Sequence, residues 1–259
     1  MSFEPYARDM SDSPRRLSVA SYNIDKARHF DPPARGNGGS RRGAVLEDLL
    51  VLEVLHQADV LALQEAIVGP LAAGAGARDT VAEIGAVLGV DGHAFHGSRD
   101  GSAREWGVAL LCRHPARFRG LDLPRAFWSP WRRSVVLGEI GAWIVASLHL
   151  EVWPLVGAAS RLAQTRALLD LVEEVDRGGG RPVVLAGDFN CEPGSAPHRL
   201  LLRRGFAPTL AGRQATWRFP GLPLHLDHIY ARGARTVQAG VERRARGSDH
   251  FPVWADLEI

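Results

Sequence analysis

An apolar segment that ends abruptly in two polar residues constrains this chain more than any other feature. Residues 183–190 read Val-Val-Leu-Ala-Gly-Asp-Phe-Asn, and the apolar part is typical of a buried β-strand. Because side chains alternate along a strand, Asp188 and Asn190 are expected on the same face at its carboxyl end. An Asp at the edge of a core is costly unless a charged or hydrogen-bonding group meets it. The pair therefore either caps a turn or belongs to a site that holds a water or a metal-bound oxyanion.

The composition allows a large hydrophobic core and argues against a membrane protein. The chain has 259 residues, 46% of them hydrophobic, which suffices for one large domain or two small ones. It lacks the run of about 18 apolar residues that predicts a transmembrane segment. Residues 1–16 lack the apolar stretch of a secretory signal, and Cys112 and Cys191 fit a reducing compartment. We therefore expect a cytoplasmic protein, and the sequence indicates no protein partner.

The charge pattern predicts no strong field for nucleic acid. The formal net charge is only +2 at pH 7. Of the 31 basic residues, Lys26 alone is a lysine. Genome composition and phosphate recognition explain this bias equally well, and the sequence leaves both explanations open.

The expected strands and helices do not follow a uniform βαβ repeat. Strands are expected at residues 17–24, 60–63, 107–112, 134–140, 142–150, 183–188, 226–230, 236–241 and 251–257. Helices are expected at residues 43–57, 80–88, 158–175 and 195–203, with Thr80 and Ser195 as N-caps.

Three consecutive strands in the middle of the chain favour antiparallel pairing. The second strand is expected to stop at Gln64 and Glu65, and residues 28–42, which are rich in Pro, Gly and Arg, are expected to form a long mobile loop. We expect a polar leader over residues 1–16 and a single domain over residues 17–259, with a mixed or antiparallel β core and helices outside.

Polar residues suited to phosphate chemistry lie at or near the ends of the expected strands. They are Asn23, Glu65, His149, Asp188, Asn190, Asp227, Asp249 and His250. Each one alone has a structural explanation, such as a turn residue, a strand-start cap or a hydrogen-bonded core histidine. Their joint occurrence favours a common site.

Six short motifs place these residues in a recognisable order. They are Ser21-Tyr22-Asn23-Ile24, Leu63-Gln64-Glu65, Ser147-Leu148-His149-Leu150, Gly187-Asp188-Phe189-Asn190, Leu226-Asp227-His228-Ile229 and Ser248-Asp249-His250-Phe251-Pro252-Val253. In this order the sequence resembles the endonuclease/exonuclease/phosphatase superfamily, the deoxyribonuclease-I-like metal-dependent phosphodiesterases and phosphatases. The resemblance spans the chain from the first strand to the last. It implies an α+β fold, a four-layer αββα sandwich of two mixed or antiparallel β-sheets flanked by helices, with the active site at one edge.

The resemblance also implies a metal site. Glu65 is expected to be the main ligand of Mg²⁺ (or Mn²⁺), with Asn23 beside it and Asp249 completing the site for one ion or two. Mg²⁺ prefers carboxylate oxygens and water, and it needs few protein ligands, so this set of residues suits it.

The remaining residues of the motifs are expected to carry out phosphate ester hydrolysis. By the resemblance, Asp188 orients or deprotonates the attacking water and Asn190 holds a phosphate oxygen. His250, paired with Asp227, stabilises the transition state or assists the leaving group, and His149 donates a further hydrogen bond to the phosphate. A neighbouring carboxylate keeps a histidine protonated, which fits the role of His250.

The signals for the substrate conflict. Residues 191–195 lack the arginine that inositol-polyphosphate 5-phosphatases and tyrosyl-DNA phosphodiesterases tend to carry after the equivalent of Asn190. Residues 190–202 resemble deadenylase-like and generic bacterial members, whereas His149-Leu150-Glu151 also occurs in tyrosyl-DNA phosphodiesterase-like proteins. A general phosphoesterase is favoured. The alternatives are a nuclease or DNA-end-processing enzyme, a sphingomyelinase-like lipid phosphodiesterase, and a non-catalytic binding module with the same fold.

Two loops carry aromatic and cationic side chains that would suit substrate binding. If these loops reach the rim of the site, Trp128, Trp131 and Trp153 would stack on bases while Arg132 and Arg133 meet phosphates. The same rings would equally serve a lipid interface or pack a loop against the domain. The substrate is thus expected to be a phosphate ester, with nucleic acid as one candidate.

Overall fold

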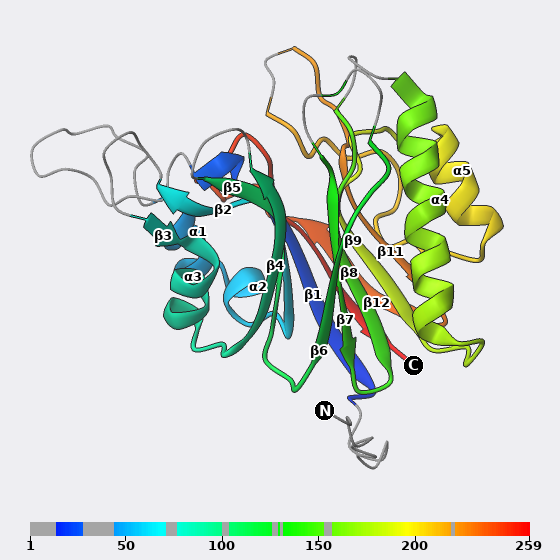
Figure 1. Ribbon diagram of the computed structural model, residues 1–259, viewed down its shortest axis with the longest axis horizontal. Coiled ribbons are helices and arrows are strands. Elements are labelled where there is room, and N and C mark those ends of the chain that lie inside the picture. The colour runs from blue at the N-terminus through cyan, green and yellow to red at the C-terminus, as the bar shows by residue number, and fades with distance from the viewer. Residues whose placement is uncertain are drawn as a thin grey trace, which may run out of the picture.

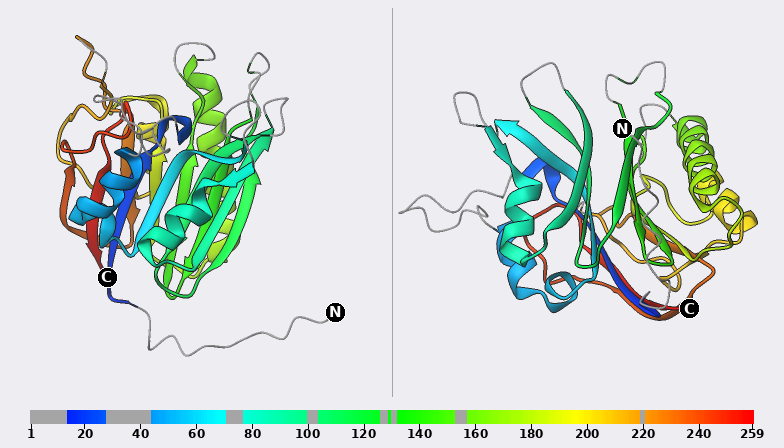
Figure 2. Two further views of the ribbon diagram at one scale, coloured as in Figure 1. Left: turned by 90° about the vertical axis from the view of Figure 1, so that its left-hand side faces the viewer. Right: turned by 60° about the horizontal axis from the view of Figure 1, so that its bottom comes forward.

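Two β-sheets pack face to face between two groups of helices (Figure 1). The computed structural model describes residues 14–27, 44–70, 77–99, 104–125, 129, 132–152, 157–218 and 221–259. Figure 2 shows the same layers from two further directions. The predicted α+β sandwich is confirmed.

Within the described residues, the first sheet has seven strands. They are β1 (Arg16–Asn23), β2 (Val60–Pro70), β3 (Ala77–Asp79), β4 (Gly92–Arg99), β5 (Glu105–Cys112), β12 (Arg235–Val241) and β13 (Val253–Glu258). Their order is β12-β13-β1-β2-β5-β4, with β3 paired to β2. Only β1 and β2 run parallel among these pairs, so the sheet is mixed.

The described part of the second sheet has six strands. They are β6 (Arg117–Asp122), β7 (Ser134–Ile140), β8 (Trp143–His149), β9 (Val183–Asp188), β10 (Ala207–Pro208) and β11 (Asp227–Arg232), in the order β10-β11-β9-β8-β7-β6. Here β8 and β9 are the parallel pair. This sheet is therefore also mixed, as predicted.

The helices cover the two outer faces of the sandwich. They are α1 (Ala44–Val51), α2 (Glu53–His56), α3 (Thr80–Leu88), α4 (Gly157–Asp176) and α5 (Ala196–Arg203), whereas the short 3-10 helix η2 (Asp25–Ala27) follows the end of β1. Helices α1 to α3 lie on the first sheet and α4 and α5 on the second (Figure 1). No helix in the described part of the chain is long and apolar enough to cross a membrane.

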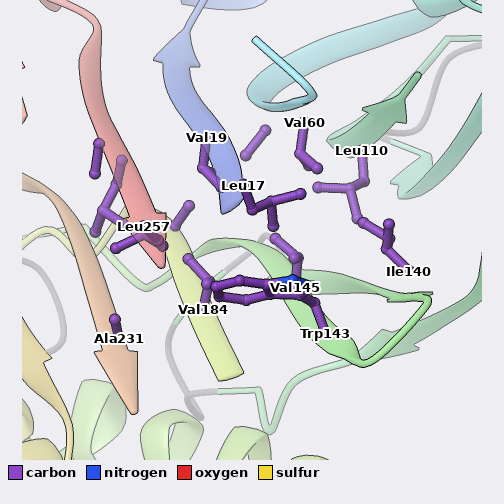
Figure 3. Close-up of a cluster of buried hydrophobic side chains, with 14 of the residues drawn as sticks. Leu17, Val19, Val60, Leu110, Ile140, Trp143, Val145, Val184, Ala231 and Leu257 are labelled. Atoms are coloured by element: carbon purple, nitrogen blue, oxygen red, sulfur yellow. The ribbon is translucent and has the colours of Figure 1, made fainter. Parts of the chain in front are cut away.

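Strand β1 shows how alternation separates the layers of the core. Leu17 and Val19 enter the core between the two sheets (Figure 3), whereas Ala20 and Tyr22 pack beneath the helices of the first sheet. Trp143 of β8 is the largest fully buried side chain of the core between the sheets. Burial of a large apolar side chain contributes about 1.5–3 kcal/mol, so this shared core holds the two sheets together.

Several element boundaries differ from the predictions. The helix expected over residues 43–57 is interrupted at Leu52, whose backbone is extended (φ −84°, ψ 109°). Asp79, not Thr80, caps α3, because its side chain accepts hydrogen bonds from the N–H groups of Val81 and Ala82. Ser195 caps α5 as predicted.

Strands β3, β4, β6 and β10 were not expected from the sequence. The loop expected at residues 28–42 lies outside the described residues, as do residues 1–13 of the expected leader. Strand β1 begins at Arg16, within the range assigned to that leader.

Candidate active site

Three polar residues lie side by side on adjacent strands of the second sheet. The parallel pairing of β8 and β9 places His149 opposite Asp188, and the antiparallel pairing of β11 and β9 places Asp227 opposite the same Asp188. All three side chains are buried. The strands behind them are apolar and fix the register, because a slip by one residue would turn each strand's core face outward.

The first sheet brings a second set of residues to the facing edge. Asn23 is the last residue of β1, and its register partner in β2 is Gln64, the neighbour of Glu65. His250 lies just before β13, which runs antiparallel to β1 and therefore starts where β1 ends.

Hydrogen bonds join the two sets across the gap between the sheets. Asn23 Nδ2 donates to Asp188 Oδ2 at 3.1 Å, and His250 Nδ1 lies 2.8 Å from Asp227 Oδ2. His250 Nε2 lies 3.9 Å from Asp188 Oδ2. Ligand atoms of Asp188, Asp227 and His250 all lie within 4.8 Å of one another. The structure thus assembles four of the predicted site residues into one buried centre.

Glu65 reaches this edge through a β-bulge. The register of β2 against β5 shifts between Gln64 and Ala66, and Glu65 has φ +58°, in the left-handed region that is costly for residues other than glycine. Strict alternation would place Glu65 with Leu63 beneath the helices. The polarity of Gln64 and Glu65 predicted that the strand would stop there. This prediction is wrong, because β2 continues to Pro70. The bulge makes Glu65 an extra residue, and its Oε2 lies 3.8 Å from Lys26 Nζ.

The surroundings of the centre raise the pKa of both His250 and Asp188. Burial alone would lower the pKa of His250, but the charge and hydrogen bond of Asp227, with Asp188 and Asp249 adding to them, raise it to about 10. Burial, followed by the charge of Asp227, raises the pKa of Asp188 to about 7, against the opposing effects of His250 and Asn23. These surroundings therefore favour the protonated form of His250 and raise the proton affinity of the Asp188 carboxyl group.

His149 is kept neutral by its surroundings. Burial and then the positive charges of Arg133, His250 and Lys26 hold its pKa well below the usual value. Arg133 Nη1 lies 3.4 Å from Nδ1 and 3.2 Å from Nε2 of the ring, and Arg133 Nη2 donates to Glu151 Oε1 at 3.3 Å. Arg133 was expected on a rim loop, but it is only 3% exposed and lies directly against His149.

Asn190 lies beyond the end of β9 rather than within the strand. It adopts φ +49°, so the two-residue period of a strand does not set its direction. Its backbone N–H donates to Asp188 Oδ1 at 2.9 Å, and its Nδ2 donates to the carbonyl of Leu150 at 3.0 Å. Asn190 therefore fixes the Asp188 carboxylate and ties the end of β9 to the end of β8.

The remaining predicted residues lie at the surface or outside the described residues. Asp249 is exposed, accepts a hydrogen bond from Trp217 Nε1 at 3.2 Å, and lies 4.0 Å from His250 Nε2. Arg132 is exposed and pairs with Asp122. Trp128, Trp131 and Trp153 lie outside the described residues.

Two hydroxyl groups that the sequence did not single out support the centre. Thr216 Oγ1 accepts hydrogen bonds from the N–H groups of Leu226 and Asp227, both at 3.0 Å. Ser248 Oγ accepts the N–H of His250 at 3.1 Å. Ser248 is part of the last motif and was identifiable from it, whereas nothing in the sequence around Thr216 indicates this contact.

Asp48 anchors the loop that carries Asp249 and His250. Its side chain accepts hydrogen bonds from the Tyr22 hydroxyl at 2.7 Å and from the N–H groups of Arg246 and Gly247 at 2.9 and 2.6 Å. A Cβ on Gly247 would lie 2.5 Å from the backbone nitrogen of Val45 at the start of α1. The loop at Gly247 thus packs closely against the start of helix α1.

Asp48→Ala is expected to destabilise the fold by at least about 2 kcal/mol, because it leaves buried donors without an acceptor. Urea unfolding measures this change, and Glu47→Ala, which removes the exposed carboxylate next to it, is the matched control. Equal stability of the two variants would show that Asp48 does not anchor the loop.

Solved structures with the same fold support the architecture. The chain aligns with an endonuclease/exonuclease/phosphatase from Beutenbergia cavernae at a TM-score of 0.71 and 23% identity, over 95% of this chain and 72% of that one. It aligns with the human nocturnin catalytic domain at 0.70 and 19% identity, over 94% of each chain. A Bacteroides thetaiotaomicron mannosyl-6-phosphatase aligns at 0.63 and 18%, over 94% of this chain and all of that one.

The sequence itself carries the signature of a family. None of the curated proteins matches it significantly. The model of the Endonuclease/Exonuclease/phosphatase family, however, matches residues 20–250, a range that includes all six motifs up to His250. The chain therefore belongs to the endonuclease/exonuclease/phosphatase family, a family of phosphoric ester hydrolases.

Proposed function

We propose that the protein is a Mg²⁺-dependent phosphoesterase in which an activated water attacks the phosphorus in line with the leaving group. The observation that carries this proposal is the centre itself. Asn23, Asp188, Asp227 and His250 come from both sheets and form one buried hydrogen-bonded set. Burying several charged groups together costs folding free energy, so such a cluster points to a functional site.

The residues at the edge of the first sheet fit a divalent metal ion. Glu65 and Asn23 supply oxygen atoms of the kind that Mg²⁺ prefers, and Asp249 adds an exposed carboxylate at the rim. The side chain of Glu65 is 16% exposed, and its carboxylate already pairs with one cation, the ammonium group of Lys26. We propose that these three residues hold Mg²⁺ or Mn²⁺. A bound ion would neutralise phosphate charge and polarise the phosphorus–oxygen bond.

Asp188 is the proposed base. Asn190 N–H and Asn23 Nδ2 each donate to one of its oxygens, which orients the carboxylate toward an attacking water. With a pKa near 7, Asp188 is ionised in part at neutral pH and has enough affinity to accept the proton that the water loses.

The histidines are proposed to act on the phosphoryl group. His250, held protonated by Asp227, donates a hydrogen bond to the phosphoryl oxygens or a proton to the leaving group. His149 is neutral and donates from one ring nitrogen to a phosphate oxygen. Asn190 is proposed to contact a phosphate oxygen as well, alongside its bond to Leu150.

The substrate is proposed to be a phosphodiester or phosphomonoester that Trp128, Trp131, Trp153, Arg132 and Arg133 help to bind. Neighbours of this fold include a mannosyl-6-phosphatase and a 2',3'-cyclic phosphatase, ANGEL2, so the architecture accommodates sugar and nucleotide phosphates. The net charge of +2 argues against avid, sequence-independent DNA binding. Two buried free cysteines, Cys112 and Cys191, support action in the reducing cytoplasm.

A substrate panel assayed with Mg²⁺ tests the proposal. Single- and double-stranded DNA and RNA, phospholipids, sphingomyelin and sugar phosphates are incubated with the folded protein, and released phosphate or cleaved product is measured. We expect turnover of one class at least about tenfold above the others, the discrimination that one or two good contacts provide. If the folded, metal-loaded protein turns over no member of the panel, the binding-module alternative replaces the phosphoesterase.

A further inference from the structure

Lys26 lies beside the proposed metal ligand at the mouth of the site. Its Nζ is 3.8 Å from Glu65 Oε2 and 5.9 Å from the centroid of the Trp106 ring. The Lys26 side chain is 43% exposed, so the ammonium group is reachable from solvent. It is also one of three cations whose charge acts on His149.

The backbone at Lys26 adopts an energetically unfavourable conformation. Asp25 and Lys26 have φ values of +45° and +53°, two consecutive left-handed residues without a glycine. Two hydrogen bonds maintain the turn: the Asp25 N–H donates to Asn23 Oδ1, and the Ile24 N–H donates to the carbonyl of Gln64, both at 3.0 Å. Costly backbone conformations persist where the surrounding structure enforces them, and they concentrate at functional sites.

The chemistry of lysine suits a contact that has to be exchanged. This chain uses arginine at every basic position except Lys26. A guanidinium at this position would bind the Glu65 carboxylate through two hydrogen bonds in a fixed fork, as Arg213 binds Glu192. A compact ammonium on a flexible stem makes a single point contact and can turn to another oxygen.

We propose that Lys26 pairs with Glu65 until a divalent cation binds that carboxylate, and then turns to the phosphate group of the substrate. The proposal rests on the proposed function, because it assigns Lys26 to the same site. Two cations compete for one carboxylate at Glu65, so metal binding releases the ammonium group. The charges of Arg133, His250 and Lys26 all act on His149, so a phosphate anion bound beside His149 would attract the released ammonium group.

Lys26→Met tests the exchange, because methionine keeps the apolar stem and removes the charge. Calorimetric titration with Mg²⁺ alone is expected to show about 2- to 5-fold tighter binding than in wild type, the range of a partly exposed ion pair. Titration with inorganic phosphate in saturating Mg²⁺ is expected to show about tenfold weaker binding, the loss of one charge-assisted hydrogen bond.

Two further variants separate this exchange from a general effect of charge. Arg235→Met removes a positive charge from the opposite end of the first sheet, where Arg235 pairs with Glu258, and is expected to leave both affinities unchanged. Lys26→Arg keeps the charge but would hold Glu65 through two hydrogen bonds, so it is expected to bind Mg²⁺ more weakly than wild type, the opposite of Lys26→Met.

The outcomes distinguish this inference from the proposed function. Neither titration requires turnover, so a wild-type protein that binds both ions without hydrolysing any ester overturns the phosphoesterase, while the exchange stands if Lys26→Met shifts both affinities as expected. Unchanged Mg²⁺ affinity or unchanged phosphate affinity in Lys26→Met overturns the exchange, whatever the turnover. A wild-type protein that binds no Mg²⁺ overturns both.

Discussion

Glu65→Gln is expected to lower Mg²⁺-dependent turnover by at least about 10³-fold, because metal ions contribute several kcal/mol to the stabilisation of a phosphoryl transition state. The amide has nearly the shape of the carboxylate, so the bulge at residue 65 keeps its packing while the negative charge is lost. Mg²⁺ affinity, measured by calorimetry, is expected to fall together with turnover. The lost activity would then trace to the metal and not to the fold.

Glu258→Gln is the matched control for this variant. Glu258 pairs with Arg16 and Arg235 at the far end of the first sheet, and its amide variant removes a carboxylate without touching the site. Wild-type turnover and Mg²⁺ affinity are expected. If Glu65→Gln retained full Mg²⁺ affinity, Glu65 would not be the main metal ligand, and the assignment of this edge would fail.

Asp188→Asn is expected to lower kcat by about 10²- to 10⁴-fold, the contribution of a positioned general base. The change removes the group proposed to accept the proton of the attacking water. It also removes one of the three negative charges that raise the pKa of His250, so that pKa is expected to fall toward its ordinary value. Steady-state kinetics measure the first effect, and an NMR titration of the histidine measures the second.

Asp256→Asn on β13 serves as the control, because Asp256 is paired with Gln238 at the sheet surface. We expect KM in Asp188→Asn to change much less than kcat, since the loss concerns the transition state and not substrate binding. A variant that raised KM alone would show that Asp188 binds substrate and that another group is the base.

Where apolar strands end in polar residues, the sequence indicated several of the side chains that the structure brings together. Val183 to Asp188 is a buried strand with its acid at the end, and His149 closes β8 in the same way. Residues that bond to each other there are far apart in the sequence, as Asn23 and Asp188 are at a separation of 165 positions. No single local pattern indicated that these ends converge, whereas the joint occurrence of the polar residues and the order of the six motifs did.

Other features could not be read from the sequence, for physical reasons. The bulge at Glu65 depends on pairing with β5, and glutamate carries no signal for a left-handed backbone. Strand β4 has glycine and two histidines in a partly exposed edge position, so it shows no clear alternation. Arg133 looked like an exposed rim residue because arginine is seldom fully buried, and only its contacts with His149 and Glu151 explain its burial.

The most direct test of the central claim is the hydrolysis of bis-p-nitrophenyl phosphate by the wild-type protein as Mg²⁺ is added and then removed. We predict a rate that saturates with Mg²⁺, disappears when EDTA is added in excess, and returns when Mg²⁺ is restored. Hydrolysis that continues undiminished in EDTA would contradict the account. So would the absence of hydrolysis in a folded protein shown by calorimetry to have bound Mg²⁺.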